Sequence, residues 1–175
     1  MTLINWADLH HDAGRYDQAL ATATAALALA RDSDDVGNQV AALGILGAAQ
    51  QGLGDSSAGI VHYLEAIALS STRVHGMHHA RAHVGLAGGL LSLGQRQEAC
   101  RHARQALKIS RLAGYRLLEG DALAALAEIH LAGEDLDEAA RLAQEALAIH
   151  RKTGYRLGAT QALALLDQAA VPAHP

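Results

Sequence analysis

The feature that most constrains the fold is an internal repeat of 40 residues, because a chain built from one recurring unit must stack those units side by side. Four positions carry a small or aliphatic residue in each of four copies. These columns are Ala19, Gly59, Ala99 and Ala139; Ala26, Ala66, Ala106 and Ala146; Leu27, Ile67, Leu107 and Leu147; and Leu29, Leu69, Ile109 and Ile149. One register kept over four copies predicts a solenoid with one structural unit in each copy.

Each unit has the pattern of two helices joined at a short turn. The turns carry a glycine, which in the fourth copy stands one place earlier: Gly14, Gly54, Gly94 and Gly133. After each turn, small and apolar residues recur at steps of three and four, which places them on one helix face. Small residues on that face let neighbouring helices approach closely, and Gly44, Gly47 and Gly88 in the preceding helices are expected to do the same.

The remaining composition indicates an all-α chain. Ala and Leu supply most of the apolar residues, Phe is absent, and both prolines lie in the last four residues. The spacing predicts helices over 2–13, 16–31, 35–53, 56–71, 75–93, 96–111, 115–132, 136–151 and 155–170.

The order of features in each copy resembles the tetratricopeptide repeat: an apolar–small pair such as Leu46-Gly47, then a turn glycine, then two small positions. Trp6 and Tyr16 in the first copy are aromatic residues that such repeats often show. The resemblance implies an all-α, right-handed superhelix of four antiparallel helix pairs and a C-terminal capping helix. The copies span about 1–33, 34–73, 74–113 and 114–153, with the cap over 154–170 and a disordered tail at 171–175. The period of 40, rather than the usual 34, implies a longer first helix in each pair.

A second similarity lies at the junctions between copies. Residues 111–117 (RLAGYRL) and 151–157 (RKTGYRL) repeat the same motif. This junction looks like that of the long repeats at the C-terminal end of actinomycete antibiotic-regulatory transcription activators, and similar repeats occur in bacterial signalling ATPases and spindle-orientation adaptors. It implies that the chain is the regulatory portion of a larger protein.

The first helices of such pairs line a concave groove, so the resemblance also implies partner-binding positions. Transferred residue by residue, the groove positions that carry distinctive side chains are Asp8, His11, Gln51, Arg81, Val84, Leu91, Asp121, Glu128, Leu131 and Gln161. Only Arg81 among them could grip a terminal carboxylate, so a carboxylate clamp is not expected. The small, apolar lining suits a helix or an extended segment laid in the groove.

A histidine cluster is the strongest candidate for metal chemistry. His75, His79 and His83 recur at steps of four and would share one helix face, and two imidazoles at that spacing can bind zinc or nickel. A closed site needs four ligands, and no Cys or acid lies in the same run, so solvated or packing histidines are the favoured interpretation. We therefore expect no cofactor and no physiological metal.

Charge and motifs exclude several other functions. The net charge is −4 and no basic run occurs, which argues against nucleic acid as a direct partner. No phosphate-binding loop of the P-loop type and no catalytic constellation is present, which argues against an enzyme. The single cysteine, Cys100, is compatible with a reducing cytoplasm, and neither a signal peptide nor a membrane span is recognisable.

The sequence thus predicts a module that binds a protein, a peptide or another domain of its own chain, within a bacterial transcriptional regulator. The alternative is a free-standing adaptor or scaffold. Leu3, Trp6 and Leu9 on the first helix would be uncovered, so a homodimer through a terminal repeat is also expected.

Overall fold

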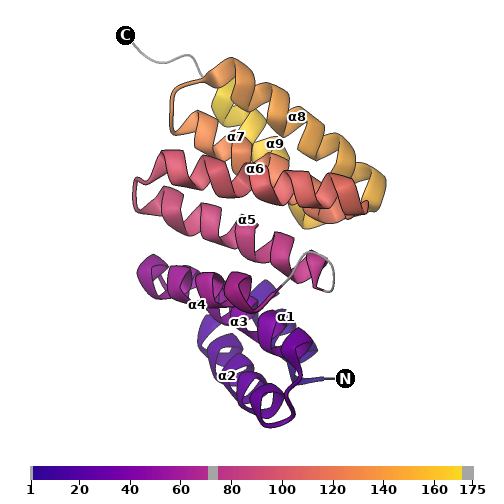
Figure 1. The fold of residues 1–175 in the computed structure, drawn as a ribbon. Helices are drawn as coiled ribbons and strands as arrows, with labels where there is room; N and C mark the ends of the chain where they lie inside the picture. Colours follow the sequence, from indigo (N-terminus) through magenta and orange to yellow (C-terminus); the bar gives the residue numbers. More distant parts are fainter. Residues whose placement is uncertain (1, 71–74, 171–175) are drawn as a thin grey trace.

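The structure, a computed structural model, describes residues 2–70 and 75–170. Over those residues the chain forms nine α-helices and no strand (Figure 1). Their bounds are α1 Leu3–Asp12, α2 Tyr16–Asp32, α3 Val36–Gly52, α4 Ser56–Leu69, α5 Gly76–Ser92, α6 Arg96–Ala113, α7 Arg116–Leu131, α8 Leu136–Thr153 and α9 Arg156–Ala170. The helix ranges predicted from the repeat agree with these bounds to within two residues at each end. The disordered tail expected at 171–175 lies outside the described residues.

The helices stack in two layers. Each helix packs against its neighbours in sequence, and the odd-numbered helices also pack against one another: α1 on α3, α3 on α5, α5 on α7 and α7 on α9. In the described part of the chain, no even-numbered helix packs on another even-numbered helix. We therefore call α1, α3, α5, α7 and α9 the inner helices and the others the outer helices. The chain is an all-α superhelical stack of helix pairs, with its two termini at opposite ends (Figure 1).

The turns within the pairs repeat one backbone conformation. Gly14, Gly54 and Gly94 have φ of 70°, 87° and 75°, in the left-handed region that glycine adopts without strain. In the fourth copy the residue with this conformation is Glu134, at φ 60°, and not Gly133. The expectation that the turn glycine had moved to Gly133 was therefore wrong, because the stacking keeps the turn at its 40-residue position whatever residue stands there. Gly133 instead leaves room for Arg96, whose Nη1 would lie 2.4 Å from a Cβ at that position.

Small side chains form the contacts between layers, as the repeat predicted. Ala19, Ala99 and Ala139 are fully buried, as are Ala66, Ala106 and Ala146. None of the helices in the described part of the chain combines the length and the apolar character that crossing a bilayer requires.

Two large rings stand in other columns that hold small residues in the remaining copies, and glycines accommodate both. Tyr63 stands where the other copies have alanine, and its ring packs between Gly47 and Gly85. A Cβ at Gly47 would lie 2.8 Å from the ring, and one at Gly85 would lie 2.3 Å from it. His150 is held in the same way between Gly120 and Gly158, where a Cβ would lie 2.5 and 2.8 Å from the imidazole. These glycines are packing residues, because any side chain there would displace a buried ring.

Candidate functional site

The inner helices enclose a cavity of about 410 Å³ that opens on their exposed face. Helices α1, α3, α5 and α7 all contribute, together with one residue of α4 and one residue directly before α9. The lining residues are Asp8, His11, Asp12, Gly44, Ile45, Ala48, Tyr63, Arg81, Val84, Gly85, Leu117, Asp121 and Tyr155. Five of the predicted groove residues are thus brought together in one site: Asp8, His11, Arg81, Val84 and Asp121.

A glycine on α3 helps to make the space. A Cβ built on Gly44 would meet no atom within 4 Å, so this glycine does not serve helix packing. It differs in this respect from Gly47, one turn away, which packs against Tyr63. The prediction that both glycines permit close helix packing is confirmed for Gly47 and wrong for Gly44, which leaves an opening in the floor of the cavity.

Arg81 is the central charged residue of the site. Its Nη1 lies 3.9 Å from Oδ1 of Asp8, so α5 and α1 are joined across the small residues of α3. Burial raises the pKa of Asp8, and the Arg81 charge opposes that rise. Burial likewise raises the pKa of Asp121 to about 6, again with Arg81 acting in the opposite direction. Both carboxylates are therefore incompletely compensated in the free protein.

Asp121 has a buried neighbour that does not itself line the cavity. Nε2 of His150 lies 3.6 Å from Oδ1 of Asp121, outside hydrogen-bonding range, and the His150 side chain is only 1% exposed. Neither ring nitrogen of His150 has a hydrogen-bond partner within the described residues. Burial lowers the pKa of His150. The Tyr155 ring packs edge-on against this imidazole, with the ring centroids 5.3 Å apart.

The other predicted groove residues make contacts within the protein. Gln51 is held in the packing: its Nε2 donates to the Gly85 carbonyl at 3.1 Å, and its Oε1 accepts from the Tyr63 hydroxyl at 3.0 Å. Leu91 and Leu131 pack against the hydrophobic core. These three side chains lie outside the residues that line the cavity.

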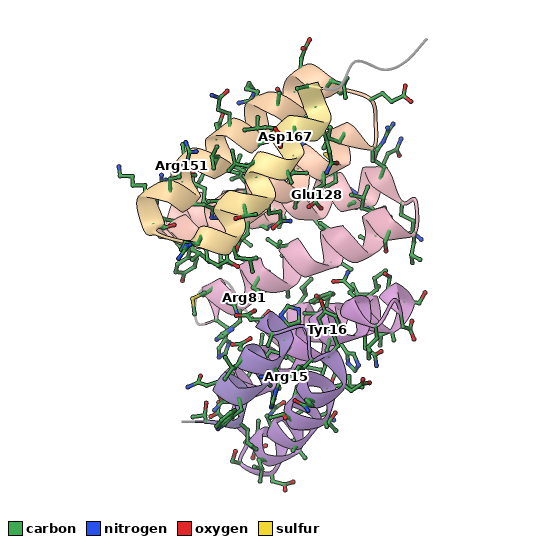
Figure 2. All side chains as sticks on the ribbon, turned by 180° about the vertical axis from the view of Figure 1, so that it is seen from behind. Arg15, Tyr16, Arg81, Glu128, Arg151 and Asp167 are labelled. Carbon is green, nitrogen blue, oxygen red and sulfur yellow. The ribbon has the colours of Figure 1, made fainter. Side chains whose placement is uncertain are left out.

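Glu128 and Gln161 bind each other. Nε2 of Gln161 donates to Oε1 of Glu128 at 2.8 Å, which joins α9 to α7. Burial raises the pKa of Glu128, and this hydrogen bond lowers it by less. Figure 2 shows Glu128 and Arg81 on the same face of the molecule, so the acid extends the charged inner surface beyond the cavity.

Sequence reasoning missed six of the lining residues: Asp12, Ile45, Tyr63, Gly85, Leu117 and Tyr155. Tyr155 could have been found, because it belongs to the repeated junction motif that precedes an inner helix. Asp12 and Leu117 carry no such signal, since each lies at the end of an inner helix, where the superhelix decides what faces the cavity.

The histidine cluster is arranged differently from the prediction. His75 is the N-cap of α5 and not part of the helix, so the three rings do not form one helical row. Nδ1 of His79 is 2.6 Å from the Ser70 hydroxyl, and Nδ1 of His83 is 2.9 Å from Nδ1 of His102 on α6. Across residues 2–70 and 75–170, no group of three His, Cys, Asp or Glu side chains is arranged to hold a metal ion. The rings of His79 and His83 contact each other within α5, and the contact of His83 with His102 joins α5 to α6.

The comparisons with known proteins identify the repeat. Residues 2–37 and residues 78–152 match models described as tetratricopeptide repeat. Two crystal structures of nearly identical TPR-like repeats of a Podosopora anserina kinesin light chain, one of them a point variant, share the fold with a TM-score of 0.65 and 18% sequence identity. The superposition covers 95% of this chain and 82% or 83% of those chains. A search among curated proteins gives no match.

Proposed function

We propose that this chain binds a segment of a partner protein in the cavity on its inner face, because residues 2–37 and 78–152 match tetratricopeptide repeats, which are protein–protein interaction modules. The observation that carries the proposal is the cavity itself, which four inner helices share and which no side chain of the described residues fills. Its wall combines apolar surface from Ala48, Val84 and Leu117 with charged groups that have incomplete partners. Such a mixture of apolar surface and a few polar groups is typical of recognition sites.

A matched pair of variants tests this proposal. Gly44→Leu places a side chain in the cavity, and because its Cβ meets no atom within 4 Å, we expect it to block the site while the helix packing is retained. Ala28→Leu adds the same apolar bulk at an exposed position on the outer helix α2. Proteins captured from the source cells by the wild-type chain should be retained by Ala28→Leu and lost with Gly44→Leu.

Circular dichroism must show that both variants remain folded. Retention of the same partners by Gly44→Leu would place binding elsewhere and refute the proposal. The double variant Arg81→Glu with Glu128→Lys reverses two charges of the inner face and should also release the partner.

We propose further that the module is the regulatory portion of a bacterial transcriptional regulator in the cytoplasm. The support is the repeated junction at residues 111–117 and 151–157, which resembles that of actinomycete antibiotic-regulatory activators. The alternative is a free-standing adaptor or scaffold. Reading the full-length gene distinguishes them, since a DNA-binding or ATPase region in the same chain supports the first and its absence the second. In neither setting do we assign the chain an enzymatic activity.

A terminal homodimer is a separate proposal. Leu3, Trp6 and Leu9 of α1 are 38%, 44% and 44% exposed, and together they form an apolar strip at the N-terminal end of the stack. Sedimentation equilibrium over a wide concentration range should give a mass that rises with concentration, and Trp6→Glu should abolish the rise. A constant monomer mass would exclude the dimer.

A further inference from the structure

The positive charges of the chain are distributed unevenly between the two layers. Within the inner helices, Arg81 is the one Lys or Arg beyond the first residue; Arg116 and Arg156 begin α7 and α9. The remaining described Lys and Arg residues lie on the outer helices or their turns. The inner face is therefore poor in positive charge along its whole length.

The cavity itself has an excess of carboxylates. Asp8, Asp12 and Asp121 line it together with a single guanidinium, that of Arg81, and with His11, whose Nδ1 lies 3.3 Å from Oδ1 of Asp12. Arg81 is already engaged, because it contacts Asp8 and acts on Asp121. An acidic ligand would meet two further carboxylates around the one arginine, whereas a basic ligand would supply positive charge beside them.

Because the carboxylates of the cavity are partly buried, their excess over positive charge matters for ligand binding. Partly dehydrated carboxylates are costly unless a cation or a hydrogen-bond donor compensates them. The raised pKa values of Asp8 and Asp121 follow from that dehydration, which the Arg81 charge offsets only in part.

A second, independent feature points to an incomplete site. His150 is buried, its two ring nitrogens lack hydrogen-bond partners, and its Nε2 faces Asp121 at 3.6 Å. Since His150 does not line the cavity, it approaches Asp121 from the protein interior. Asp121 thus has His150 on its protein side, and it lines the cavity on the other.

The shape and lining fit a long basic side chain. Lys and Arg have aliphatic stems that cover apolar surface while the charged end remains hydrogen-bonded. Ala48, Val84 and Leu117 offer apolar wall for such a stem, and Tyr155 adds an aromatic ring beside the carboxylates.

We propose that the cavity receives a lysine or arginine side chain from the partner segment, with Asp121 and Asp8 as its acceptors. This proposal rests on the proposed function, because it assumes that the partner binds on the inner face. It adds the chemistry of the partner: a segment with one buried basic residue flanked by small or apolar residues.

Selection from a displayed library of random 12-residue peptides at pH 7.5 tests the proposal. The enriched peptides should carry Lys or Arg at one fixed position. Replacing that residue by methionine in the best peptide, or Asp121→Asn in the protein, should weaken binding by roughly 10- to 100-fold, as expected for a hydrogen bond to a charged group. Asp32→Asn is the control, since it removes the same charge from an exposed position on the outer helix α2 and should change the affinity by less than about twofold.

The outcomes separate this proposal from the proposed function. Enriched peptides without a basic residue, whose binding Gly44→Leu abolishes, would overturn the basic-residue proposal and leave the inner-face site standing. Equal weakening by Asp32→Asn and Asp121→Asn would also overturn it, because attraction to the net charge would then explain the preference. A library that yields no peptide sensitive to Gly44→Leu would overturn both.

Discussion

The contact between His83 and His102 allows a test of how a departure from the repeated apolar pattern affects the stability of the fold. His83 occupies a column in which the copies before and after have Leu43 and Leu123. His102 stands 40 residues before Leu142. The two Nδ1 atoms are 2.9 Å apart, so one ring donates and the other accepts. The histidine pair thus replaces apolar residues that the next copy buries in its core. The perturbation we consider is the double substitution His83→Leu with His102→Leu.

The expected magnitude follows from the environment of His83. Burial, followed by the nearby rings of His79 and His102, lowers the pKa of His83 from 6.5 to about 4. The unfolded chain therefore takes up a proton near pH 6.5, and the folded chain does so only near pH 4. Stability is fully present above pH 6.5 and is lost as the pH falls through that interval, by about 3 kcal/mol in total. Burial also lowers the pKa of His102, so its contribution has the same sign.

Urea unfolding at a series of pH values between 7.5 and 4 measures this effect. The free energy of unfolding of the wild type should fall by about 3 kcal/mol more over this range than that of the double variant. At pH 7.5 the double variant should be as stable as the wild type or more so, because both polar partners are replaced together. The reciprocal change, Leu123→His with Leu142→His, should impose a new loss of stability in acid. Parallel pH profiles for the wild type and His83→Leu with His102→Leu would refute the reasoning.

Three further predictions concern the inner helices. Gly85→Ala should lower the free energy of unfolding by about 1–3 kcal/mol, because its Cβ would lie 2.3 Å from the Tyr63 ring, and the same change in a Tyr63→Ala background should cost nothing. Thermal unfolding of the wild type, Gly85→Ala, Tyr63→Ala and the double variant measures this. A loss of stability from Gly85→Ala that persists in the Tyr63→Ala background would show that contact with the ring is not its cause. Gly44→Ala should instead raise stability by about 0.5–1 kcal/mol through helix propensity alone, since its Cβ meets no atom within 4 Å; a loss in denaturant unfolding would contradict this. Burial raises the pKa of Asp121 to about 6 in the folded state, so protonation of this one group should contribute up to about 3 kcal/mol of stability as the pH falls from 7 to 4, opposing the loss expected from His83. Asp121→Asn should lack that gain, and an unchanged difference between the two proteins across this pH range would disprove it.

The amino-acid sequence by itself determined the repeat, the helix class and the helix bounds. These depend on local periodicity and on columns of small residues, both of which can be read along the chain. It also indicated that Arg81 and Asp121 share one repeat column, and in the structure both line the cavity. The two residues are 40 positions apart, and residues in one column of a solenoid lie on successive inner helices.

Only the tertiary structure determined which residues of different repeat columns contact one another. Arg81 reaches Asp8 on α1 because the small residues of α3 between them leave the space open. The 40-residue period does not predict the curvature of the stack that brings α1 near α5. The pairing of His83 with His102, and the use of Gly47 and Gly85 to hold Tyr63, depend in the same way on contacts between different helices. The periodic pattern determines which face of its helix a side chain occupies. The small rotation between successive helix pairs determines which residue of another helix that side chain contacts. That rotation results from the packing of all the side chains together, and for this reason the inner face was predictable and its charged cavity was not.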